Sequence, residues 1–150
     1  MKKYFIYYSN SGNGDFVAEA LKRSDVSLIK LEPKKHIKKM NFFRIIRYGG
    51  EAMMKKKMPI QQLDLILDSD DVVVIGSPIW NDRLSTPVLT LLDKYEFDKK
   101  TTRFVLYSGG GKAARAEKQI AKMGFEKKAI VLKEPKKYSE EAKVLLKDIF

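Results

Sequence analysis

The chain has no cysteine among its 150 residues. This absence excludes disulfides, thiolate zinc sites, iron–sulfur clusters and catalytic thiols. The single histidine, His36, lies within a run of lysines, so neither a His-rich metal site nor a Ser-His-Asp triad is predicted. No apolar run approaches the length of a membrane span. We therefore expect a cytoplasmic protein without a membrane span or a metal site.

Acidic residues are also few. The chain has 19 Asp and Glu against 30 Lys and Arg, for a formal net charge of +11. A surface of this kind attracts anions, acidic proteins, nucleic acids or anionic membranes. Hydrophobic residues still make up 44% of the chain, which is enough to bury a core. A chain of this length fits one domain spanning residues 1–150.

Short apolar runs alternate with helical patterns along the chain. The predicted strands are Tyr4–Tyr8, Val26–Leu31, Val72–Ser77, Arg103–Tyr107 and Ala129–Leu132. Helical spacing of apolar residues follows most of them, and strict alternation of this kind predicts a parallel sheet covered on both faces. The fold class is therefore α/β, a three-layer α/β/α sandwich around a doubly wound, five-stranded parallel sheet of order 2-1-3-4-5.

Residues 34–68 are the least clear part of the chain. The spacing of Phe42, Phe43, Ile45 and Ile46 favours a helix face that is interrupted at Gly49.

The predicted strand order places a ligand site beyond the carboxyl ends of strands 1, 3 and 4. The loops there are Ser9–Gly14, Pro78–Leu84 and Ser108–Lys112, and they concentrate glycine, small hydroxyls and the only tryptophan. The first loop joins a strand to a helix N-terminus, where free N–H groups and the helix dipole favour a phosphate. The alternative is an ordinary turn, since Ser, Asn and Gly are turn residues.

The other two loops suit a flat ligand. Trp80 follows a buried strand and offers a plane for stacking on a heterocycle, although a tryptophan of the core is the alternative. Gly109, Gly110 and Gly111 offer bare backbone that a planar ligand can approach closely. The alternative for this glycine run is a flexible loop with no ligand.

These three segments resemble the flavodoxins. The segment Tyr8–Gly14 is similar to their loop for the phosphate of FMN, Ile75–Trp80 to the strand and loop that pack an aromatic ring on the flavin, and Phe104–Gly111 to their second flavin loop. The resemblance implies non-covalently bound FMN and a role as a redox carrier. The residues that it would assign to the cofactor are Ser9, Asn10, Ser11, Gly12, Asn13, Gly14, Pro78, Ile79, Trp80, Asn81, Ser108, Gly109, Gly110 and Gly111.

Three features depart from the family pattern. Gly14 stands where flavodoxins usually have threonine, so one hydroxyl donor to the phosphate is lost. The second flavin loop has no aromatic residue, because Tyr107 lies within the preceding strand. The net charge is positive, whereas family members are commonly acidic.

Three hypotheses of function follow. The first is an electron-transfer protein that shuttles electrons between a reductase and an acceptor, with redox protein partners that are acidic. The second is an FMN-dependent NAD(P)H oxidoreductase acting on quinone-like acceptors, with Arg83, Lys112 and Arg115 near the flavin. The third is a basic binding module without flavin, using the runs Lys34–Lys39 and Lys55–Lys57, although no motif for specific nucleic-acid recognition accompanies them.

Overall fold

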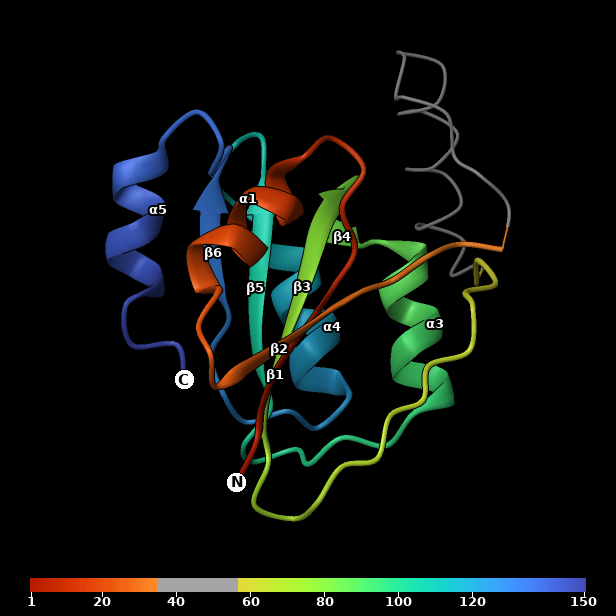
Figure 1. The fold of residues 1–150 in the computed structure, drawn as a ribbon. Coiled ribbons are helices and arrows are strands. Elements are labelled where there is room, and N and C mark those ends of the chain that lie inside the picture. The colour runs from red at the N-terminus through yellow and green to blue at the C-terminus, as the bar shows by residue number, and fades with distance from the viewer. Residues whose placement is uncertain (35–56) are drawn as a thin grey trace.

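The computed structural model describes residues 1–34 and 57–150. Figure 1 shows a twisted sheet with helices on both faces and with both chain termini near its lower end. The elements, in chain order, are β1 (Lys3–Tyr7), α1 (Asn13–Leu21), β2 (Val26–Lys30), β3 (Val72–Trp80), β4 (Arg83–Leu84), α3 (Thr86–Lys94), β5 (Arg103–Ser108), α4 (Ala114–Lys122), β6 (Ile130–Lys133) and α5 (Ser139–Leu146). His36 and the helix face predicted at residues 42–46 lie outside the described residues.

The long strands pair in the order β2-β1-β3-β5-β6, and every pair along this path is parallel. The fourth and fifth predicted strands are β5 and β6, so the predicted order 2-1-3-4-5 is confirmed. The α/β fold with helices on both faces is confirmed as well. The parallel pairing agrees with the β-α alternation, because a connection between parallel strands crosses over one face of the sheet.

Two clusters of buried side chains hold the three layers together. On one face, Phe5 and Val74 pack with Val17 of α1 and Leu146 of α5. On the other face, the core includes Ile75 and the buried side chains of α3 and α4. The central strand β3 is therefore covered from both sides, as its β-branched run predicts.

Gly76 is required by the packing of one sheet face. Phe5 and Tyr7 of the neighbouring β1 stack with ring centroids 5.0 Å apart and an interplanar angle of 6°. A Cβ atom on Gly76 would lie 2.7 Å from Cζ of Phe5 and 2.9 Å from Cβ of Tyr7. The bare backbone at this position leaves room for the stacked rings.

The predicted loop Pro78–Leu84 is wrong. Strand β3 continues to Trp80 and turns back into β4, with Trp80 paired to Arg83 in an antiparallel hairpin. The two residues of the turn, Asn81 and Asp82, have φ values of 49° and 60°. This left-handed pair is typical of the two-residue hairpin turn that Asn and Asp favour.

The segment before β3 runs beside helix α3 (Figure 1). The hydroxyl of Thr90 donates to the carbonyl of Met58 at 2.7 Å, and the N–H of Leu63 donates to the hydroxyl of Tyr95 at 2.8 Å. Ile60 forms an isolated antiparallel bridge with Pro33. Within residues 1–34 and 57–150, no helix is long and apolar enough to cross a membrane.

Candidate functional site

The three loops predicted to bind a ligand begin at one edge of the sheet. Strands β1, β3 and β5 are direct neighbours and parallel, so their carboxyl ends meet at the upper edge in Figure 1. This edge is the ligand position that doubly wound sheets favour.

The β1–α1 turn presents backbone donors. Gly12, the residue before the helix, has a φ of 93°, a conformation that glycine adopts without strain. The hydroxyl of Ser9 accepts a hydrogen bond from the N–H of Asp15 at 3.1 Å. The N–H groups of Asn13 and Gly14 in the first helical turn have no acceptor among residues 1–34 and 57–150. Free N–H groups at the positive end of a helix form an anion site.

The asparagines of this turn have unequal surroundings. Asn13 is engaged on both sides, because its Nδ2 donates to Ser11 Oγ at 3.3 Å and its Oδ1 accepts from the N–H of Lys136 at 3.2 Å. The Nδ2 atom of Asn10 is buried and has no hydrogen-bond partner within the described part of the chain. A buried donor without an acceptor is costly. A phosphate or a polar group of a bound nucleotide would supply the acceptor, so the residues present fit the predicted cofactor.

Packing explains the glycine at position 14. The buried hydroxyl of Tyr107 donates a hydrogen bond to the carbonyl of Tyr8, directly against the turn. A Cβ atom on Gly14 would lie 2.6 Å from that hydroxyl, 2.8 Å from Cβ of Ser9 and 2.8 Å from the Tyr8 carbonyl oxygen. Tyr107 thus occupies the space that a threonine side chain would need. Burial raises the pKa of Tyr107 well above its ordinary value, so the hydroxyl remains a donor.

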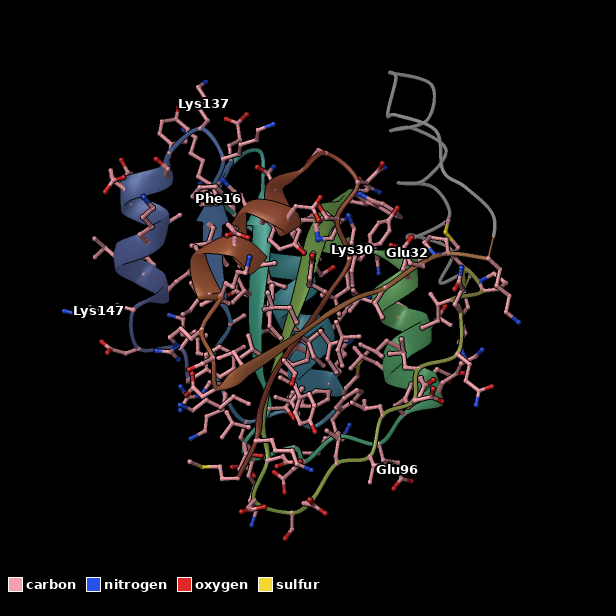
Figure 2. The ribbon with its side chains drawn as sticks, viewed as in Figure 1. Phe16, Lys30, Glu32, Glu96, Lys137 and Lys147 are labelled. Atoms are coloured by element: carbon pink, nitrogen blue, oxygen red, sulfur yellow. The ribbon has the colours of Figure 1, made fainter. Side chains whose placement is uncertain are left out.

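A charged pair stands beside the same helix start. Asp15 forms an ion pair with Lys30 of β2 at 2.7 Å, and the hydroxyl of Tyr7 donates to Asp15 at 3.3 Å. Burial, with the nearby Asp15 carboxylate, raises the pKa of Tyr7 to about 12. Figure 2 shows Lys30 beside α1, on which Phe16 is also labelled. Lys30 offsets the charge of Asp15, which would otherwise oppose an anion at this helix terminus.

The end of β3 differs from the open aromatic platform expected of it. Trp80 is only 5% exposed and belongs to the core on the α3 and α4 side. Its ring meets Tyr8 edge to face, with centroids 5.7 Å apart and an interplanar angle of 89°. Pro78 and Ile79 are half-buried, and Asn81 is exposed at the hairpin tip. Stacking of Trp80 on a flavin stays a prediction, and it requires this ring to become accessible.

The β5–α4 loop matches the expected bare backbone in part. Cβ atoms added to Gly109 and Gly110 would meet nothing within 4 Å, so these two residues border open space. Gly111 has a φ of 71° and packs against the side chain of Lys133. The hydroxyl of Ser108 donates to the carbonyl of Lys112 at 2.7 Å and closes the loop. The two open glycines are the part of this loop that a planar ligand can approach.

Cations gather beside the hairpin. Arg83, Arg115, Lys118 and Lys122 line a cleft of about 190 Å³ together with a glutamine of α4. Asp82 accepts a hydrogen bond from the N–H of Arg115 at 3.3 Å, which ties the hairpin turn to the start of α4. The predicted neighbours Arg83 and Arg115 are thus brought together. Lys112 is exposed on the preceding loop.

One residue of this edge was not predicted. Lys136 lies in the β6–α5 loop, and its Nζ atom is 3.6 Å from the place that a Cβ atom on Gly12 would occupy. Its backbone N–H is the donor to Asn13. The available signal was that a loop rich in lysine follows a strand of the same parallel sheet.

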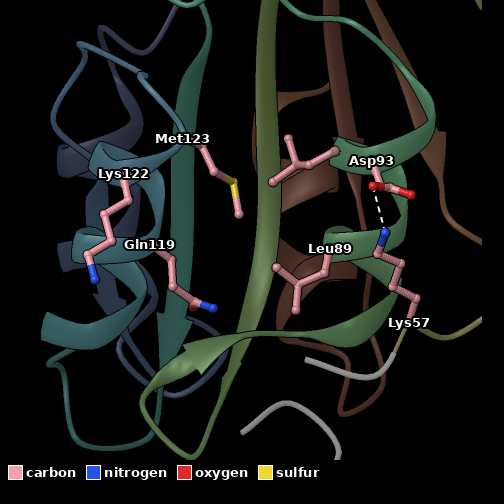
Figure 3. Close-up of a pocket in the computed structure, with 7 residues that line it drawn as sticks. Lys57, Leu89, Asp93, Gln119, Lys122 and Met123 are labelled. Atoms are coloured by element: carbon pink, nitrogen blue, oxygen red, sulfur yellow. Dashed lines mark ion pairs between the residues drawn. The ribbon is translucent and has the colours of Figure 1, made fainter. Parts of the chain in front are cut away.

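A larger hollow adjoins the basic cleft and shares Gln119 and Lys122 with it. It has a volume of about 370 Å³ and lies between α3 and α4 (Figure 3). Leu89, Leu92 and Met123 give it an apolar lining, and Lys57 pairs with Asp93 at 2.6 Å at its side. None of the residues predicted for the cofactor lines it.

The fold, the turn of free donors and the bare glycine loop define a nucleotide-binding α/β protein of the doubly wound type. The flavodoxin family model matches residues 2–148. The chain therefore belongs to the flavodoxin family, which confirms the resemblance found in the sequence and supports FMN as the cofactor. No curated protein matches the chain.

Solved structures share the fold. A flavoprotein from Lactobacillus acidophilus in complex with FMN is 19% identical and has a TM-score of 0.68, over 93% of this chain and 97% of that one. A candidate flavoprotein from Bacteroides uniformis is 20% identical and has a TM-score of 0.69, over 98% of each chain. One from Bacteroides eggerthii is 17% identical and has a TM-score of 0.66, over 99% of this chain and 97% of that one.

Proposed function

We propose that this protein binds FMN and transfers electrons between a reductase and an acceptor in the cytoplasm. The observation that carries the proposal is the β1–α1 turn of a flavodoxin-family chain, where the N–H groups of Asn13 and Gly14 and the buried Asn10 amide lack acceptors among the described residues. The FMN phosphate supplies acceptors for these donors. A similar structure from Lactobacillus acidophilus contains FMN, which agrees with this assignment.

Different loops bind different parts of the cofactor. The residues of the turn, from Ser9 to Gly14, bind the phosphate with backbone and side-chain donors. Gly109 and Gly110 give the flavin ring close access to backbone, and Pro78–Asn81 border it on the other side. When bound, FMN supplies the redox chemistry, accepting and releasing electrons. The protein positions the ring and leaves an edge open to partners.

The charge distribution supports acidic redox partners. Lys112, Lys136 and Lys137 are exposed on loops at the upper edge of the sheet, and Lys133 is exposed at the end of β6. Lys137 stands at this end in Figure 2, whereas Glu96 lies at the opposite end. Charges arranged in this way steer complementary partners and raise association rates in a salt-dependent manner.

A second candidate function is favoured by the basic cleft beside the hairpin. Arg83, Arg115, Lys118 and Lys122 surround it, and the Nε atom of Arg83 is buried without a partner among the described residues. A phosphorylated nicotinamide nucleotide carries anionic groups that suit such a cleft. In this alternative the protein is an NAD(P)H oxidoreductase for quinone-like acceptors.

Reduction kinetics separate the two functions. The FMN-loaded protein is mixed anaerobically with NADPH or NADH, with and without a catalytic amount of a flavoprotein reductase, and flavin bleaching is followed. An electron carrier is reduced only when the reductase is present, and its rate falls as salt rises. Rapid bleaching by the nucleotide alone, slowed by Arg115→Met, contradicts the carrier and supports the oxidoreductase.

A further inference from the structure

The β6–α5 loop brings a lysine over the turn that binds the phosphate. Lys136 is anchored there by its backbone, because its N–H donates to Asn13 Oδ1 at 3.2 Å. Its side chain then reaches Gly12, where the Nζ atom lies 3.6 Å from the position of an added Cβ atom. The ammonium group is therefore held against the first turn of α1 by a segment more than a hundred residues away in sequence.

The loop is attached to β5 at its start and is closed by an internal turn. The N–H of Glu134 donates to the carbonyl of Ser108 at 3.1 Å, and the carbonyl of Glu134 accepts from the N–H of Lys137 at 2.7 Å. Pro135, just before Lys136, is buried. These contacts fix the backbone from which Lys136 extends, so its approach to Gly12 does not depend on the lysine side chain alone.

The neighbouring lysines, Lys133 at the end of β6 and Lys137 in the loop, are directed elsewhere. The Nζ atoms of Lys133 and Lys137 lie 5.1 Å and 5.3 Å from the ring centroid of Tyr138, and Lys137 also pairs with Glu134 at 3.9 Å. Lys136 has no carboxylate partner within residues 1–34 and 57–150. Its charge is thus available to an anion at the turn.

A cation would compensate for the hydroxyl donor that the β1–α1 turn lacks at position 14. Gly14 adds no hydroxyl, because Tyr107 fills the space where a side chain would stand. A phosphate monoester carries nearly two negative charges near neutral pH. We propose that Lys136 binds the phosphate of FMN and makes the protein select FMN over riboflavin, an inference that rests on the proposed FMN function.

Equilibrium binding to the apoprotein tests this role. FMN and riboflavin are titrated, with flavin fluorescence as the readout, into wild type, Lys136→Met and Lys137→Met. Both variants remove one charge from the same loop, and Lys137→Met is the matched control. We expect Lys136→Met to weaken FMN binding about five- to tenfold at low salt, as the loss of one favourable charge interaction next to water implies. Riboflavin binding should be unchanged in all three proteins.

Two further measurements test whether the effect of Lys136 is electrostatic: a salt series and the variant Lys136→Arg. Screening at about 0.5 M salt should shrink the difference between wild type and Lys136→Met. Lys136→Arg should retain most of the affinity for FMN, since it keeps the charge. If Lys136→Met binds FMN as tightly as Lys137→Met does, the role of Lys136 is refuted while FMN binding stands. If wild type binds neither flavin, the proposed function and this inference both fail.

Discussion

The substitution Gly14→Ala tests the packing of the phosphate turn against the core. The new Cβ atom would lie 2.6 Å from the Tyr107 hydroxyl and 2.8 Å from the Tyr8 carbonyl oxygen. Separations under 3.0 Å require something to move, and the Tyr8 oxygen belongs to the backbone. The hydrogen bond between Tyr107 and Tyr8 holds both groups in place.

Two opposing effects set the magnitude. Replacing a helical glycine by alanine without strain stabilises a protein by about 0.4–1 kcal/mol. Overpacking a well-filled site costs about 1–3 kcal/mol, and a backbone atom gives way less readily than a flexible side chain. The clash therefore prevails, and we expect a net loss of about 1–2 kcal/mol in the free energy of unfolding. In a chain of this size each kcal/mol lowers the melting temperature by about 2–4 °C.

Urea unfolding of the apoprotein measures this loss. Trp80 is the only tryptophan and is buried beside Tyr8, so its fluorescence reports on the site. The matched control is Gly110→Ala, because a Cβ atom there meets nothing within 4 Å. The control should be as stable as wild type or slightly more stable. An unfolding midpoint of Gly14→Ala at or above that of Gly110→Ala would show that the new Cβ atom does not clash with Tyr107 and Tyr8.

Three further changes probe the same structure. Tyr107→Phe removes the hydrogen bond to the Tyr8 carbonyl and should cost about 0.5–1.5 kcal/mol in urea unfolding, while making Gly14→Ala less costly in the double variant. Gly76→Ala places a Cβ atom 2.7 Å from the Phe5 ring and should cost about 1–3 kcal/mol, part of which Phe5→Leu should restore; no loss in Gly76→Ala would contradict this. Asp71 accepts hydrogen bonds from the N–H groups of Asp68 at 2.9 Å and Lys2 at 2.7 Å, which lower its pKa. Its stabilising effect is present above the ordinary carboxyl pKa of 3.8 and is lost as the pH falls through the lowered folded value, so Asp71→Asn should flatten the acid side of a pH–stability curve.

The sequence patterns were sufficient to predict the sheet and the meeting of the three loops at one edge. Continuous β-branched runs such as Val72–Ile75 are typical of parallel sheets covered on both faces, and glycine and serine follow the strands that meet at the centre of the sheet. These features are local, so they can be read along the chain. The predicted strand order is one of the common orders of doubly wound sheets with five strands.

The hairpin was missed because its signal is short. Pro78 and the Asn81–Asp82 pair suggest a loop, yet the same Asn–Asp pair adopts the left-handed turn that joins β3 to β4. Strand β4 has two residues, too few for any alternation of polar and apolar side chains to appear.

The contacts around the β1–α1 turn could not be predicted from the sequence, because they join residues that are far apart in the chain. Tyr107 and Tyr8 are separated by 99 residues, and Lys136 and Asn13 by 123. The sequence shows that Gly14 stands where flavodoxins usually have threonine. It does not show which side chain fills the space beside Gly14. Only tertiary packing reveals that Tyr107 does so and that Lys136 covers the turn.

Retention of FMN by the purified protein is the most direct test of the proposed cofactor site. The purified protein is equilibrated with FMN, freed of excess by gel filtration and examined by visible absorption and flavin fluorescence, with circular dichroism to confirm folding. We expect a retained flavin spectrum with quenched fluorescence, at about one FMN per chain for a single cofactor site. A folded protein that retains no flavin would contradict it.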